Sequence, residues 1–354
     1  MIPDSKYLKI YEETKDDIVR GIYKYGEKLP SKRVYADMKG VSIITVMHAY
    51  ELLADEGYIS PKEKSGYFVS FDEADTYSEI GSKEQLRIEP VKTDLRDKEG
   101  FSFSVYSKTV RRVLAEYEGK LFERSEDFGL KELREAIASY LARSRNIYAS
   151  PECIIIGYGA EYLYSLILEA FGREITYGIE KPSYHKIEKV YTAGGAITEG
   201  LALGNDGIES EALRTSTAKI LHVSPYRSFP SSVMASAGKK REYLRWALER
   251  DAVIVEDDFE SEFSPLRKPE ETLFFLGKGD RVIYLNTFSQ TIGPFIKIAY
   301  MVVPERFIET FKNRTGFHSC PVPTLEQFVL TELLNSGAFE RHINKVRRAL
   351  RKKN

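Results

Sequence analysis

The sequence predicts two folded domains: a small α+β domain of three helices and a β-hairpin, then a large α/β domain with a mainly parallel sheet. Three observations support this fold class. The chain has 354 residues, which is long for one domain. Residues 1–71 show helical periodicity followed by two short β-rich runs. From about residue 101, helical patterns alternate with short β-branched runs, as expected for a parallel sheet covered by helices on both faces.

Composition narrows the class of protein. Hydrophobic residues make up 42% and charged residues 30%, which is typical of a soluble globular chain. No apolar run approaches the roughly 20 residues that span a bilayer, and the start has no signal-peptide core. We therefore expect a cytoplasmic protein. Cys153 and Cys320 provide neither a disulfide framework nor a metal site, so no metal is expected.

The first element is a helix with an apolar stripe, which we expect to end at Tyr25-Gly26. Ser31 then caps a short helix that runs to Met38, and Gly40 supplies the next turn. The apolar residues of the first helix are Tyr7, Leu8, Tyr11, Ile18 and Ile22.

The next elements are a third helix and a hairpin. Ser42 caps the helix, and the runs 57–59 and 67–69, separated by PKEKSG, form the hairpin. The buried face of the helix is expected to be Val46, Ala49, Tyr50 and Leu53.

Two helices joined by a glycine-containing turn and followed by a hairpin describe a winged helix-turn-helix. The third helix would enter the major groove of DNA with Ser42, Ile43 and Thr45, and the hairpin would place Lys62 and Lys64 near phosphates. Residues 1–71 contain eleven basic and eleven acidic side chains, hence no net charge. Because phosphate contacts dominate affinity, we expect weak binding or an unusual sequence preference.

Four elements in residues 25–70, KLPSKR, GVSIITV, EGY and SGYFV, together resemble the GntR-type DNA-binding domain over its whole length. The resemblance implies a double-stranded DNA operator as partner. The chain departs from the family pattern at Ile43, where an arginine is usual. Helix capping is an equal alternative for Ser42 and Thr45, and a surface charge is the alternative for Arg33. The DNA-contacting positions implied by the resemblance are Ser31, Arg33, Ser42, Thr45, Lys64 and Gly66.

A linker is expected between the two domains. Residues 72–100 contain nine acidic and five basic side chains, together with Gly81 and Pro90. The expected domains are therefore 1–71 and 101–354. Strands of the large domain are expected at 154–157, 175–180, 219–224, 252–257 and 281–287.

Several segments of the large domain resemble the fold-type-I aminotransferase domain that follows a GntR-type module in MocR regulators. They are DFGLKELREAIASYLARSRNI, SPYRSFPSSVM, IVEDDFESEF and VIYLNTFSQTIGPFIKIAYMVVP. The resemblance implies a three-layer domain, a homodimer with its cofactor pocket at the subunit boundary, and a small C-terminal domain. Because the sequence ends at Asn354, we expect that small domain to be truncated or absent.

The cofactor implied by the resemblance is pyridoxal phosphate, whose chemistry needs a lysine for the Schiff base and a carboxylate at the ring nitrogen. The position of the lysine is Gln290, and a carboxamide cannot form an imine, so we expect no catalytic residue and no covalent cofactor. Non-covalent binding of the cofactor is left open. Asp257 keeps the carboxylate, Phe259 replaces a tyrosine and Lys297 replaces a phosphate-binding arginine.

The implied cofactor-like pocket has an alternative reading at several positions. Asp257 could be a strand-end carboxylate satisfied by backbone donors, and Glu161 would repel a phosphate unless it turned away. Tyr184, Ser289 and Lys297 could serve packing or solvation. The pocket residues are Gly159, Ala160, Tyr184, Arg227, Asp257, Phe259, Ser289, Gln290 and Lys297.

The sequence therefore predicts a DNA-binding transcriptional regulator in which a pseudoenzyme domain dimerises and senses a small-molecule effector. One alternative is a working aminotransferase with a fused DNA-binding domain, against which Gln290 argues directly. The other is a truncated remnant without function.

Overall fold

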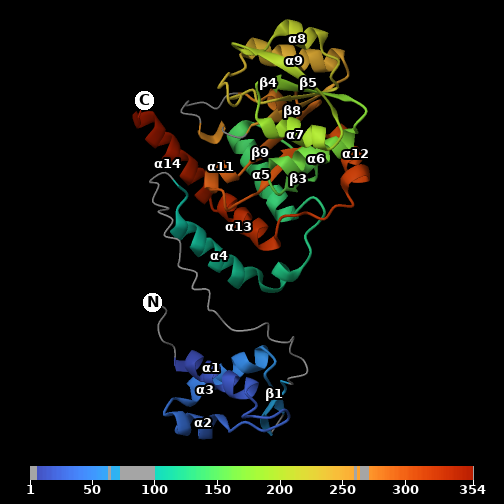
Figure 1. Ribbon diagram of the computed structural model, residues 1–354. Helices are drawn as coiled ribbons and strands as arrows, with labels where there is room; N and C mark the ends of the chain where they lie inside the picture. The colour runs from blue at the N-terminus through green and yellow to red at the C-terminus, as the bar shows by residue number, and fades with distance from the viewer. Residues whose placement is uncertain (1–5, 63–64, 72–99, 259–260, 264–270, 354) are drawn as a thin grey trace. The chain divides into compact units, whose positions relative to one another are not determined.

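The computed structural model describes residues 6–62, 65–71, 100–258, 261–263 and 271–353. The chain divides into two compact units, Met1–Lys92 and Thr93–Asn354 (Figure 1). Apart from Gly100, the linker expected over 72–100 lies outside the described residues, as do Lys64 and Phe259.

The smaller unit contains three helices and a hairpin. Both predicted N-caps are confirmed: Ser31 Oγ accepts a hydrogen bond from the Val34 N–H, and Ser42 Oγ accepts one from the Thr45 N–H. The buried face of the third helix is the predicted one. The elements are α1 (Lys6–Val19), α2 (Lys32–Lys39), α3 (Ile43–Asp55), β1 (Ile59–Lys62) and β2 (Gly66–Val69).

Two predicted boundaries in this unit are wrong. The first helix ends at Val19, because Gly21 adopts a φ of +73° and turns the chain. Ile22 is consequently 60% exposed, and Ile10 packs into the core instead. The first strand begins at Ile59, two residues later than predicted, because Gly57, with a φ of +81°, belongs to the turn after α3.

The larger unit is built on an eight-stranded sheet of order β3-β10-β9-β8-β7-β4-β5-β6. All five predicted runs form strands, and the pairs from β9 to β5 are parallel. The strands β5, β6 and β10 were not predicted, and β10 lies antiparallel between β3 and β9. The strands are β3 (Ile154–Gly157), β4 (Thr176–Lys181), β5 (Ile197–Gly204), β6 (Gly207–Ile208), β7 (Ile220–Val223), β8 (Val253–Asp257), β9 (Val282–Thr287) and β10 (Ala299–Val302).

Helices cover both faces of this sheet, so the unit has three layers (Figure 1). One face packs against α6 (Ala160–Phe171), α7 (His185–Ala193) and α12 (Glu305–Thr315). The other face carries α4 (Phe103–Tyr117), α5 (Lys131–Arg145), α9 (Ala237–Glu249), α13 (Thr324–Asn335) and α14 (Ala338–Lys353). Three shorter helices complete the unit: α8 (Ser210–Thr215), α10 (Leu273–Leu276) and α11 (Ser289–Ile292).

The alternation of side chains along β8 decides where its acidic residues lie. Val253 and Val255 belong to the core on the α6 face, whereas Ile254 belongs to the core on the α5 face. The three consecutive acids that follow are all buried. With a period of two, Asp257 faces the α6 layer, while Glu256 and Asp258 face the opposite layer.

Candidate functional site

A cavity of about 520 Å³ lies at the carboxyl ends of β3, β4, β7, β8 and β9. Loops at this edge of a parallel sheet converge, which is why ligands of α/β folds bind there. The residues lining the cavity are Tyr158, Gly159, Ala160, Glu161, Tyr164, Tyr184, Lys186, Ile187, Ser224, Phe229, Asp257, Thr287, Ser289, Gln290 and Lys297.

Asp257 is a buried acidic residue in the lining of this cavity. The hydroxyl of Tyr164, from α6, donates to its Oδ2, and the Nε2 atom of His222 lies 3.5 Å from the same oxygen. Burial and the neighbouring Asp257 raise the pKa of Tyr164 well above its ordinary value, so the phenol stays protonated as a donor. Within the part of the chain that the structure describes, the Asp257 Oδ1 atom has no hydrogen-bond partner. That oxygen can accept a bond from a ligand.

The amino terminus of α6 forms another wall. Gly159 precedes the helix with a φ of +86°, a conformation that favours glycine. Glu161, in the first turn, accepts a hydrogen bond of 2.6 Å from Lys186 Nζ. Partial burial works against ionisation, but this bond, the Glu161 backbone N–H and Lys297 together lower the pKa of Glu161. The wall therefore carries an ionised carboxylate between two lysines.

Ser289 and Gln290 open the short helix α11, directly after β9. The Ser289 hydroxyl donates to the Ile296 carbonyl at 2.6 Å and so holds the following loop against the helix. Lys297, in that loop, places its Nζ atom 5.9 Å from the centroid of the Tyr158 ring. Gln290 is exposed to the cavity and offers it a carboxamide.

Seven of the nine residues predicted for the pocket meet at this cavity. Arg227 is exposed, is not among the lining residues, and its Nη2 lies 3.4 Å from Ser232 Oγ. Sequence reasoning missed Tyr164, Lys186 and Phe229. Tyr164 could have been found from its position, because it lies about one helical turn after the start of α6, which begins at the pocket.

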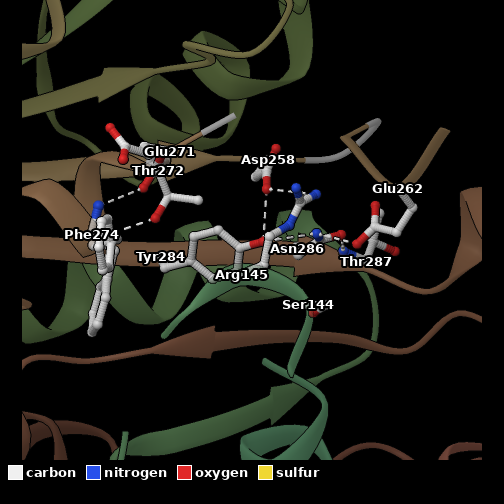
Figure 2. Close-up of polar contacts among 12 residues, drawn as sticks. Ser144, Arg145, Asp258, Glu262, Glu271, Thr272, Phe274, Tyr284, Asn286 and Thr287 are labelled. Carbon is white, nitrogen blue, oxygen red and sulfur yellow. Dashed lines mark hydrogen bonds and ion pairs between the residues drawn. The ribbon is translucent and has the colours of Figure 1, made fainter. Parts of the chain in front are cut away.

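Behind the cavity, a buried polar network joins the ends of β8 and β9 to α5 (Figure 2). Arg145, the last residue of α5, lies 3.3 Å from Asp258 Oδ2, which also accepts a 2.7 Å bond from the Tyr284 hydroxyl. Asn286 donates to Glu262 at 2.8 Å and accepts from the Thr287 N–H at 2.5 Å. The network therefore fixes the ends of β8 and β9. Asp257 and Thr287, the chain neighbours of Asp258 and Asn286, line the cavity.

Three buried glutamates, one of them the Glu262 of this network, lie near the strand ends. Burial raises the pKa values of Glu180, Glu256 and Glu262 to about 7. Glu180, on β4, accepts a 2.9 Å bond from Ser228, while both oxygens of Glu256 accept backbone N–H groups at the start of α10. Each bond partly offsets the cost of burying a carboxylate.

Pyridoxal phosphate is the cofactor implied by the sequence resemblance, and the lining of the cavity fits it in part. The Asp257 Oδ1 atom, which has no hydrogen-bond partner among the described residues, fits a protonated ring nitrogen. Tyr184 and Phe229 offer aromatic faces. The amide of Gln290 does not fit covalent attachment, since its nitrogen is not nucleophilic. The lining therefore offers partners for a heteroaromatic ring, and Gln290 itself cannot form a Schiff base with it.

In the smaller unit, the predicted DNA-contacting residues Ser31, Arg33, Ser42 and Gly66 are exposed, and Thr45 is half-buried. Ser42 is the N-cap of α3, so the capping alternative holds for Ser42 without excluding a contact to DNA. Thr45 is not a cap, but its N–H donates to Ser42 Oγ. Ser31, predicted as a cap, is the N-cap of α2. Beside Ser42, Ile43 is 48% and Ile44 is 62% exposed.

No helix among the described residues is both long and apolar enough to span a bilayer. The described residues also include no group of three or more His, Cys, Asp or Glu side chains placed to hold a metal ion.

Residues 6–69 match the family model described as bacterial regulatory proteins, gntR family. The chain is 31% identical to an uncharacterized HTH-type transcriptional regulator, YdeL, of Bacillus subtilis, over 98% of this chain and 77% of the relative. It is 30% identical to the HTH-type pyridoxine biosynthesis transcriptional regulator PdxR of Corynebacterium glutamicum, over 99% and 77%. The chain thus spans about three quarters of the length of these relatives.

The larger unit has the fold of an aminotransferase. The kynurenine aminotransferase of Pyrococcus horikoshii superposes with a TM-score of 0.63 at 22% identity, over 70% of this chain and 64% of that chain. At that identity the likeness concerns the fold.

Proposed function

The chain belongs to the MocR-type family of GntR regulators, and from this premise we propose that it is a transcriptional regulator that binds operator DNA as a homodimer and senses a small molecule without Schiff-base catalysis. The observation that carries the proposal is the pairing of a winged helix-turn-helix with a cavity lined by Gln290, the residue that the sequence resemblance aligns with the Schiff-base lysine.

The DNA-binding part of the proposal rests on the smaller unit. Ser42 and Thr45 stand on the first turn of α3, the turn that meets base edges in helix-turn-helix proteins. Ser31 and Arg33 stand at the start of α2, and Gly66 at the wing. We assign these five residues, together with Lys64, to the DNA contact, and we place the domains at 1–71 and 101–354 with a linker at 72–100.

The sensing part rests on the cavity. A buried carboxylate with an open oxygen, Asp257, selects a ligand that donates a hydrogen bond, such as a protonated ring nitrogen. Gln290 contacts such a ligand only through hydrogen bonds, so the ligand binds and dissociates without chemical change. In this reading pyridoxal phosphate is a candidate effector, bound non-covalently, and no residue is catalytic.

A DNA-binding titration tests the regulator function. Fluorescence anisotropy with the duplex upstream of the protein's own gene is expected to show preference over random duplex, with affinity falling steeply as salt rises. Arg33→Ala should weaken binding at every salt concentration. Arg20→Ala is the matched control, because Arg20 lies at the end of α1 beside Asp16. Equal affinity for upstream and random duplex would contradict the proposal.

A further inference from the structure

Two apolar side chains stand exposed on the first turn of α3. Ile44 is 62% exposed, and its helical position lies opposite the buried face that contains Val46 and Tyr50. Ile43, beside it, is 48% exposed. The turn that the fold would present to a DNA groove is therefore apolar at its centre.

The hydroxyls that flank these isoleucines are partly engaged. Ser42 Oγ and Thr45 Oγ1 lie 2.8 Å apart in a mutual hydrogen bond, and Ser42 Oγ also accepts from the Thr45 N–H at 3.2 Å. These bonds use part of the polar capacity of the turn. The exposed surface of this turn is therefore mainly the hydrocarbon of Ile43 and Ile44.

Lysines surround the wing of the same unit. Lys32 Nζ lies 5.3 Å from the Tyr67 ring centroid, and Lys62 Nζ lies 4.4 Å from that of Phe68. A Cβ built on Gly66 would meet Lys28 Cε at 3.2 Å, so Lys28 lies across the wing as well. A cationic wing beside an apolar helix turn suits a polyanion that displays apolar groups.

Duplex DNA displays one apolar group in its major groove, the C5 methyl of thymine. We propose that Ile43 and Ile44 recognise this methyl group, so that the preferred sites of this protein place thymines under the first turn of α3. This inference rests on the proposed DNA-binding function and names the base that the helix selects. Burial of one methyl group is worth roughly 0.8 kcal/mol, so each contacted thymine raises affinity about fourfold.

The test begins with the full chain and a library of random duplexes, from which bound sequences are selected and enriched. The preferred duplex is then made again with deoxyuridine in place of each thymine in turn, which removes only the methyl group. Wild-type protein should bind the substituted duplex about fourfold more weakly at one or two positions per half-site. Ile43→Ala/Ile44→Ala should bind both duplexes equally, since alanine favours the helix but does not reach the methyl group.

Ile22→Ala is the matched control, because Ile22 is equally exposed at 60% but lies outside the helices. It should keep the full sensitivity to deoxyuridine. Equal binding of thymine and deoxyuridine duplexes by the wild type would overturn the inference while leaving the regulator function intact. The inference would also be overturned if Ile43→Ala/Ile44→Ala kept the sensitivity to deoxyuridine but changed the oligomeric state seen by sedimentation. That result would assign the two isoleucines to a contact between protein chains. Failure to enrich any sequence would instead refute DNA recognition itself.

Discussion

Replacing Glu180 by glutamine should change how the stability of the larger unit depends on pH. The Glu180 carboxyl is buried on β4 and its pKa is raised by that burial to about 7, against 4.5 for an ordinary glutamate. Between these values the unfolded chain has already lost the proton that the folded chain retains. The free energy of unfolding of the wild type therefore falls as pH rises through this window, and the loss is complete above about pH 7.

The size of this effect follows from the two pKa values. A separation of about 2.5 pH units at about 1.4 kcal/mol per unit gives roughly 3 kcal/mol. Glutamine cannot ionise, so Glu180→Gln should become more stable than the wild type by about this amount between pH 4.5 and pH 8. Any constant cost of fitting the amide beside Ser228 cancels in this comparison between pH values.

Urea unfolding followed by fluorescence gives the measurement, because Trp246 is the one tryptophan of the sequence and is buried in the larger unit. The free energies of unfolding of wild type and Glu180→Gln should diverge from pH 5 to pH 7, and their difference should level off by pH 8. Glu249→Gln, at an exposed site on α9, should follow the wild type at each pH. A stability difference between Glu180→Gln and wild type that is the same at pH 5 and pH 8 would refute the reasoning.

Three further predictions use the same preparations. Arg145→Met should lower the free energy of unfolding by about 3–5 kcal/mol, because the buried Asp258 carboxylate keeps the Tyr284 hydroxyl but loses its cation. Arg143→Met, at a half-exposed ion pair, should cost less than about 1 kcal/mol in the same urea titration. Gly129→Ala should lower the free energy of unfolding by more than about 1 kcal/mol, because the φ of Gly129 is +98° and a Cβ there would lie 2.8 Å from the Ile156 side chain on β3. Gly119→Ala is the control and should change stability little in the same assay, because nothing lies within 4 Å of a Cβ at that position. Gln290→Lys should gain pyridoxal phosphate in borohydride-trapped mass spectra without transaminating amino acids; trapped cofactor on the wild type would contradict the placement of the site.

Local signals in the sequence predicted much of the fold. The caps at Ser31 and Ser42 act within one helical turn, and the five predicted strands are short runs rich in β-branched residues, so both can be recognised without tertiary information. The strand β5 was missed because ITEGLALG mixes glycines with polar residues. The strand β10 was missed although Gly293-Pro294 marks a turn before it.

The cavity was predicted only where a motif pointed to it. Asp257 and Gln290 belong to recognisable segments, but Tyr164 reaches Asp257 across 93 residues through the packing of α6. Likewise, Arg145 and Asp258 are joined only because α5 ends beneath β8. Contacts of this kind depend on the order of strands in the sheet, which no local pattern encodes.

The adjacent acids Asp257 and Asp258 lie on opposite sides of one strand end, so the residue that lines the cavity is separate from the residue that fixes the strand. Asp258 is held by Arg145 and Tyr284, so the strand end keeps its position whatever occupies the cavity. Exposed residues that line the cavity, such as Gln290 on α11, can then be exchanged one at a time without disturbing the strand ends. A scaffold of this kind can drift from one ligand to another by single substitutions, each of them compatible with a folded chain.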